Sequence, residues 1–235
     1  MRSWVVLVLA LATGCSSGKH SAQPELNNLR AGEYLREDYI RALCDSLSPL
    51  KATRPDDDPQ MIIVGRDKAG TSFMPTHNFH EGDNLFRPSK DGMFEPDEQG
   101  AFNSMNFRLR LRGAESFSLL RGSNELKFRF VGDTEHWVSE TVLAGQYEDA
   151  EGKQYVFGAN GEASFPGNRR FRYTLATDHV LNAYDYIYST DLKTTWAAAI
   201  SQKKLLIYEV GGDHEEIVGA TPKWSLERLT APSCK

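Results

Sequence analysis

The 235-residue sequence contains three cysteines and none of the motifs that identify the common enzyme classes. It has no Gly-x-Ser-x-Gly nucleophile elbow, no glycine-rich phosphate loop and no H-E-x-x-H metal pair. Its N-terminal apolar run, Trp4 to Leu11, is too short to span a bilayer as a helix. We therefore expect no catalytic residues, no metal, no cofactor and no enzymatic activity.

The sequence also has fewer basic than acidic residues. The 27 Lys and Arg residues are outnumbered by 32 Asp and Glu residues, and the net charge is −5. Such a chain has no general attraction for nucleic acid or for anionic lipid surfaces. The basic residues are scattered, except that Arg108, Arg110 and Arg112 alternate with apolar residues over 107–112. This alternation predicts the solvent-facing side of a strand, with an anion-binding site as the alternative.

The first 15 residues have the pattern of an export signal. Arg2 provides positive charge and residues 4–11 provide an apolar segment of the usual secretory length. The segment ends in Leu11-Ala12-Thr13-Gly14-Cys15, which resembles the lipobox of bacterial lipoproteins. The alternative is an ordinary signal peptide with an incidental cysteine.

The lipobox resemblance implies a location in the cell envelope. Residues 1–14 are expected to be the signal peptide, and Cys15 is expected to become the acylated N-terminus, which anchors the protein in a lipid bilayer. Ser16 after the cysteine favours the outer membrane, with the protein facing the periplasm. The polar residues 15–30 then form a flexible tether, and a protein of the cell envelope is a possible partner.

Residues 31–235 are expected to form the folded domain, with a possible subdivision near residue 133. Residues 31–48 predict one N-terminal helix, because Leu35, Tyr39 and Leu43 recur at helical spacing.

The segment Trp137–Phe165 predicts strands. Tyr155 and Phe157 alternate with polar or small neighbours, and turns are expected at 149–152 and 159–162 because Gly and Asn tolerate positive φ. Similar alternation recurs about every ten residues on both sides of this segment, without long helical stretches between. These features predict a mostly β fold, an antiparallel meander closed into a barrel, or two β units.

Residues 141–210 resemble the calycins, the lipocalin-like class of meander barrels. The resemblance rests on Gly145-Gln146-Tyr147 in the place of Gly-x-Trp, on the Glu-Gly and Asn-Gly hairpins, and on the final KLLIYEV. It covers roughly a third of the chain and implies a lipocalin-like barrel.

Two cysteines remain if Cys15 carries lipid. Exported proteins meet an oxidising compartment, in which paired cysteines usually join. We therefore expect a disulfide between Cys44 and Cys234, with two unpaired thiols as the alternative.

The region 77–106 contains the most concentrated polar residues. His77, His80 and Asp83 belong to a His/Glu/Asp cluster over 77–83, but His77 and His80 have opposite strand parity and point to opposite faces. An ordinary strand end is favoured over a metal site or a binding rim. Residues 82–106 are predicted to be a long loop that acts as a lid or binding loop.

Function is suggested only by the aromatic residues of the predicted strands. Tyrosine is unfavourable in a dry core unless its hydroxyl has a partner. We therefore predict a pocket bordered by Tyr173, Tyr186, Tyr188 and Trp196 that binds a small amphipathic or apolar ligand. The alternatives are a solid core and a structural or protein-interaction lipoprotein without such a ligand. The predicted inward set is Tyr147, Tyr155, Phe157, Phe165, Phe171, Tyr173, Tyr186, Tyr188, Trp196 and Tyr208.

Overall fold

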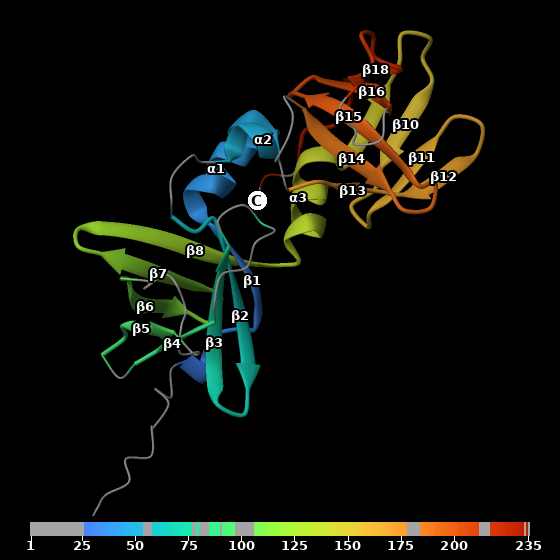
Figure 1. Ribbon diagram of the computed structural model, residues 1–235. Coiled ribbons are helices and arrows are strands. Elements are labelled where there is room, and N and C mark those ends of the chain that lie inside the picture. Colours follow the sequence, from blue (N-terminus) through green and yellow to red (C-terminus); the bar gives the residue numbers. More distant parts are fainter. Residues whose placement is uncertain are drawn as a thin grey trace, which may run out of the picture.

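The computed structural model confirms a mostly β protein, built from two antiparallel sheets that each curl into a nearly closed barrel (Figure 1). It describes residues 26–53, 58–76, 79, 85–89, 91–96, 106–177, 184–211, 217–232 and 234. The predicted signal peptide, Cys15 and the His77–Asp83 cluster, apart from Phe79, lie outside the described residues.

The first barrel is a meander in which consecutive strands pair, so each short connection forms a hairpin. Its strands are β1 (Gly32–Arg36), β2 (Met61–Asp67), β3 (Gly70–Thr76), β4 (Phe86–Pro88), β5 (Phe94–Pro96), β6 (Arg108–Gly113), β7 (Ser116–Arg121) and β8 (Asn124–Gly132). β8 returns to pair with β1, and a single bridge between Met93 and Arg108 links the β5 end to β6. Strands β4 and β5 fall within 82–106, so the expectation of one long loop there is wrong.

The second barrel is also an antiparallel meander. Its strands are β9 (Gly145–Glu148), β10 (Gln154–Phe157), β11 (Glu162–Phe165), β12 (Arg169–Arg172), β13 (Thr174–Leu175), β14 (Asp185–Ser189), β15 (Thr194–Ile200), β16 (Lys204–Gly211), β17 (Ile217–Val218) and β18 (Trp224–Arg228). β18 pairs with β9. β12 pairs with β11, and β13, one residue further along the chain, pairs with β14. The path around this barrel therefore closes through Tyr173.

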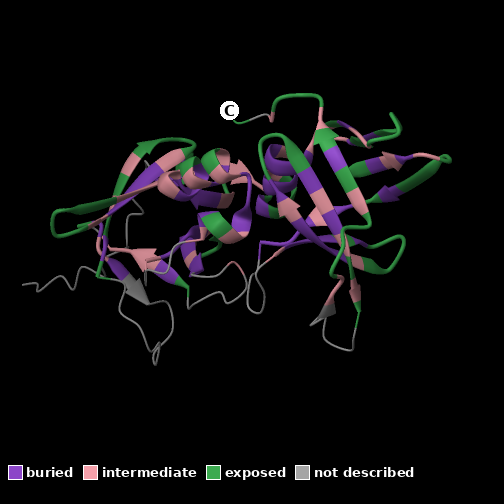
Figure 2. Cartoon of the chain, turned by 90° about the horizontal axis from the view of Figure 1, so that it is seen from above, coloured by how far each residue is buried: buried purple, intermediate pink, exposed green. Residues whose placement is uncertain are grey.

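The α-helices of the described residues lie between the barrels (Figure 1). They are α1 (Glu37–Ser46), α2 (Pro49–Ala52) and α3 (Thr134–Leu143), and a 3-10 turn, η1, spans Leu26–Asn28. Figure 2 shows buried residues on these helices where they face the sheets. Leu35 and Met61, on the outer side of the first barrel, share a buried cluster with helix residues and with the interior of the second barrel.

The predicted helix over 31–48 begins too early and continues too far. Residues 32–36 form β1 instead, because Tyr34 is paired on both sides, with Ile62 of β2 and with Phe130 of β8. This pairing overrides local helix propensity. At the other end, Leu47 adopts the left-handed conformation with φ 51° and ends α1. Its N–H donates a hydrogen bond to the Leu43 carbonyl.

Helix α3 replaces the first strand predicted over 137–165. Its start is fixed by Asp133, whose carboxylate accepts a hydrogen bond from the His136 N–H in the usual N-cap arrangement. Val138 and Val142 lie four residues apart and are fully buried. The remaining strands and both hairpin turns are as predicted, with positive φ at Gly152 and Gly161.

The predicted disulfide between Cys44 and Cys234 is present. The two Cα atoms lie 5.7 Å apart, although 190 positions separate the residues in sequence. The bond joins α1 to the segment after β18, and so ties the helical layer to the end of the second barrel.

Candidate functional site: a charged cleft on the first barrel

The four residues predicted to border one pocket lie on two sides of the second barrel. Trp196 pairs with Ile187 across β14 and β15, so these two side chains share the inner face. Tyr186 and Tyr188 have the opposite parity and lie on the outer face, where Tyr188 is 39% exposed. Tyr173 and Trp196 belong to the inner cluster, whereas Tyr186 belongs to a separate one. The structure therefore does not bring these four residues together on one face of the barrel.

The interior of the second barrel is occupied by aromatic rings in edge-to-face contact. The Phe157 ring lies 5.6 Å from Tyr147, 5.6 Å from Phe165 and 5.0 Å from Tyr173, measured between ring centroids. The series continues through contacts among Phe171, Trp196 and Trp224. Such contacts stabilise a core beyond simple burial of area.

The hydroxyls of the inner tyrosines have protein partners. Tyr173 donates to the Gly158 carbonyl at 2.9 Å, and Tyr147 donates to the Leu143 carbonyl at 2.8 Å. Burial raises the pKa of both phenols above the ordinary value. The need for a hydroxyl partner, which motivated the predicted ligand, is met at these two positions by main-chain carbonyls.

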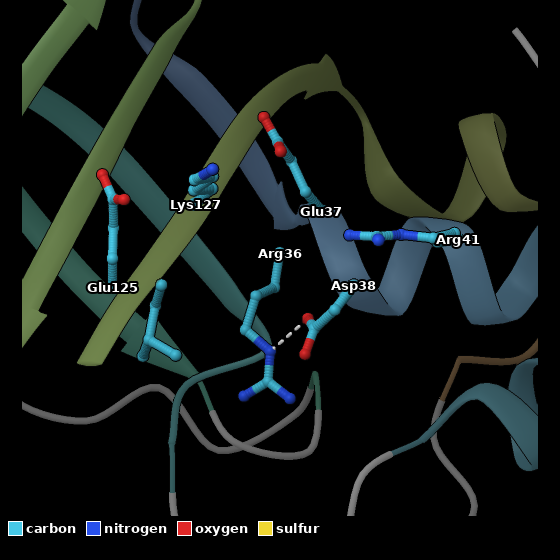
Figure 3. A pocket seen from close by; sticks show the side chains of 7 residues that line it. Arg36, Glu37, Asp38, Arg41, Glu125 and Lys127 are labelled. Atoms are coloured by element: carbon cyan, nitrogen blue, oxygen red, sulfur yellow. Dashed lines mark hydrogen bonds and ion pairs between the residues drawn. The ribbon is translucent and has the colours of Figure 1, made fainter. Parts of the chain in front are cut away.

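A cleft of about 200 Å³ lies instead on the outside of the first barrel, between the start of α1 and strand β8 (Figure 3). It is lined by Arg36, Glu37, Asp38, Arg41, Glu125, Leu126 and Lys127. Figure 3 shows Glu125 and Lys127 on β8 and the other charged residues on the opposite side, around the start of α1. The two sides come together because β1, which leads directly into α1, pairs with β8 in the register Arg36 to Phe128.

Arg36 is the most deeply buried charged residue that lines the cleft. Its side chain is only 2% exposed, and its Nε donates to the Asp38 carboxylate at 2.6 Å. The same carboxylate accepts from the Tyr39 N–H at 2.8 Å, in the first turn of α1. A buried guanidinium needs such charge-assisted bonds, because an unpaired buried charge is strongly destabilising. The Arg36–Asp38 pair therefore links the last residue of β1 to the first turn of α1.

The acidic residues of the cleft connect it to the arginine row of β6. Arg112 lies 3.7 Å from Glu37, and Arg110 lies 3.6 Å from Glu125. The Ser118 hydroxyl lowers the pKa of Glu125, and the neighbouring cations Lys127, Arg110 and Arg112 lower it further. Glu125 is therefore ionised at neutral pH.

This arrangement can recognise charged groups. Three cations and three carboxylates line the cleft, and the arginines of β6 extend its basic part across the barrel surface. In the part of the chain that the structure describes, no group of three His, Cys, Asp or Glu side chains could hold a metal ion. Among those same residues, no helix has the length and apolar character needed to cross a membrane.

The sequence predicted the exposed arginine row beside the cleft but not the cleft itself. The alternation over 107–112 correctly predicted the solvent-facing side of a strand: Arg108, Arg110 and Arg112 are exposed, whereas Leu109 and Leu111 are half-buried. The cleft residues 36–41 fall within the helix predicted over 31–48, and their local pattern does not indicate a site. Their proximity to β8 depends on the β1–β8 pairing, which no local pattern signals.

Comparisons with protein-family models, with curated proteins and with solved structures found no match for this chain.

One further buried acid links the helical layer to the second barrel. Asp185 of β14 is 3% exposed, and its Oδ1 accepts a hydrogen bond from the Leu50 N–H of α2 at 2.9 Å. Burial raises the pKa of Asp185, and this outweighs the opposing effects of Leu50, Ser48 and Lys51. The fully buried Tyr39 lies close enough for Asp185 to raise the pKa of its phenol.

The raised pKa of Asp185 predicts a pH-dependent contribution to stability. Because the folded state holds this proton more tightly, stability falls as pH rises from the unfolded value of about 4 through the folded pKa. Asp185→Asn keeps an oxygen that can accept from Leu50 and has no proton to lose. The variant should therefore gain stability relative to the wild type as pH rises, as measured by urea unfolding over a pH series. A stability difference that does not change with pH would contradict this.

Proposed function

We propose that this protein is a membrane-anchored extracytoplasmic lipoprotein that binds another envelope protein through the outer face of its first barrel. The observation that carries the proposal is the packing of aromatic rings around Phe157 inside the second barrel, because rings that contact one another there favour a surface role over a ligand cavity. The charged cleft and the adjoining arginine row support a role in recognition. The lipobox-like segment ending at Cys15 supports the anchor.

The proposed anchor would hold the first barrel close to the membrane. Leu26 and Leu29 are buried in the core of that barrel. Cys15 precedes Leu26 by eleven positions (26 − 15 = 11). At a maximum of about 3.6 Å per residue, such a segment spans no more than roughly 40 Å. A lipid-anchored chain would therefore present the first barrel to proteins in or near the same membrane.

Mass spectrometry of the membrane-extracted protein tests the anchor and the mode of action together. Under denaturing conditions we expect a chain that begins at Cys15 and carries acyl groups. Under native conditions we expect no additional small molecule, because the proposed role uses the surface. Cys15→Ser should yield an unacylated protein that is released from the membrane fraction.

Two results would contradict the proposal. A free, unacylated N-terminus on membrane-extracted wild type would remove the anchor. A small molecule retained at one equivalent per chain would instead support the ligand-carrying alternative.

A further inference from the structure

Strand β6 is the last strand of the first barrel sheet, and one of its edges is only partly paired. On one side it pairs with β7 along its length. On the other side the described residues give one bridge, Met93 to Arg108, and the hydrogen bonds Leu109 N–H to Gly92 at 2.8 Å and Phe94 N–H to Phe107 at 3.4 Å. Beyond Leu109, this edge has no ladder partner within the part of the chain that the structure describes.

The direction of the main-chain groups follows from this pairing. In an antiparallel ladder, the N–H and C=O of one residue point to the same edge, and those of the next residue point to the other. The Leu109 N–H is directed to the outer edge, toward Gly92. The N–H and C=O of Leu111 therefore point to the outer edge as well. Such unpaired groups are a template for another strand.

The side chains of β6 indicate which residue types an added strand would need on each of its faces. Arg108, Arg110 and Arg112 are exposed on the outer face, with Lys127 of β8 in the same row as Arg110 and Ser118. On the inner face, Leu109 and Leu111 are only partly buried against the barrel core. The edge thus presents cations on one face and incompletely covered leucines on the other. It does so in a chain whose net charge is −5.

We propose that the outer edge of β6 is a strand-addition site that binds an extended segment of a partner protein in which acidic and apolar residues alternate. The added strand runs antiparallel to β6. Its acidic side chains lie beside Arg110 and Arg112, and its apolar side chain opposite Leu111 covers that leucine. Main-chain bonds to Leu111 provide affinity, and the charged row provides specificity. This inference rests on the proposed function in that it names the chemistry of the envelope partner.

The ion pairs of the arginine row do not block such a partner. The contacts from Arg110 to Glu125 and from Arg112 to Glu37 are 3.6 and 3.7 Å long, and the arginine side chains are 61% and 38% exposed. Exposed pairs of this length contribute little to stability. Carboxylates arriving on an added strand can therefore share or replace these partners at low cost.

The test is fluorescence anisotropy of a labelled peptide, acetyl-Glu-Val-Asp-Leu-Glu-Val-amide, titrated with the detergent-solubilised full-length protein. We expect saturable binding that weakens with added salt. The double variant Arg110→Glu/Arg112→Glu should weaken binding by about tenfold or more. The matched control, Arg169→Glu/Arg170→Glu, makes the same change of charge at exposed positions of β12. It should bind like the wild type, and circular dichroism confirms that both variants are folded.

A pair of modified peptides separates strand addition from simple charge attraction. N-methylation of the valine and leucine nitrogens removes the N–H groups that face Leu111, and it should abolish binding. N-methylation of the acidic residues alters N–H groups that face away from β6, and it should be tolerated. Equal binding of the two modified peptides would overturn strand addition.

Absence of binding to the unmodified peptide would also overturn the inference, because the arginines would then serve only to keep the edge from pairing. Neither outcome depends on acylation of Cys15, so failure here is distinguishable from failure of the proposed anchor.

Discussion

Reduction of the Cys44–Cys234 disulfide should lower the free energy of unfolding by about 4–5 kcal/mol. The bond closes a loop of 190 positions that contains almost all of both barrels. In the chain-entropy account, a cross-link stabilises the native state by restricting the unfolded chain, and the effect grows with loop length. Few other single changes in this protein should have a comparable effect.

Urea unfolding monitored by tryptophan fluorescence measures this effect with and without reductant. The double variant Cys44→Ser/Cys234→Ser is the matched control, because it removes the bond without a reducing agent. Its unfolding curve should coincide with that of the reduced wild type. Both should also show a steeper denaturant dependence, since an uncrosslinked unfolded chain exposes more surface. An unchanged midpoint after confirmed reduction would contradict the prediction.

Strand parity was predictable only where polar residues mark one face. In β10, Gln154 and Val156 alternate with Tyr155 and Phe157, and the latter two are buried inside the barrel as predicted. In β14, Tyr186, Ile187 and Tyr188 are consecutive, and so alternation cannot identify the inner face. The structure places Ile187 inside and the tyrosines outside.

Strand β16 shows the same ambiguity. Its run Leu205-Leu206-Ile207-Tyr208 offers apolar side chains to both faces, and Leu205 and Ile207 are the buried pair. Tyr208 lies outside, beside Tyr184 at 5.4 Å between ring centroids. The outer face of the barrel carries a second apolar cluster that contains Ala176, Tyr186 and Ala197. Apolar side chains therefore occur at both the inward-facing and the outward-facing positions of these strands.

The charged cleft depends on long-range pairing and was therefore beyond local reasoning. Residues 36–41 and 125–127 meet because β1 inserts between β2 and β8. Leu35 has helical spacing to Tyr39 and Leu43, so the local sequence predicts a continuous helix and gives no sign of that insertion. By contrast, the Cys44–Cys234 bond was predictable, because these are the two cysteines that remain if Cys15 carries lipid, and the expected export favours a disulfide between them.

Phe157→Ala should destabilise the protein by about 3–5 kcal/mol. Phe157 is 1% exposed and contacts the rings of Tyr147, Phe165 and Tyr173. Removing its ring deletes those contacts and leaves a cavity that the surrounding rings cannot readily fill. The matched control is Val156→Ala on the same strand. Val156 faces outward and is 38% exposed, so its truncation should change stability by less than about 0.5 kcal/mol.

Addition of benzene distinguishes a filled barrel from a ligand-binding one. An apolar cavity created inside a packed core stays dry and binds small apolar molecules. Benzene should therefore raise the urea midpoint of Phe157→Ala by mass action and leave the wild type and Val156→Ala unchanged. The proposed surface-based function requires this contrast. Stabilisation of the wild type by benzene would mean that its barrel already contains space for a ligand, and would favour the small-ligand alternative.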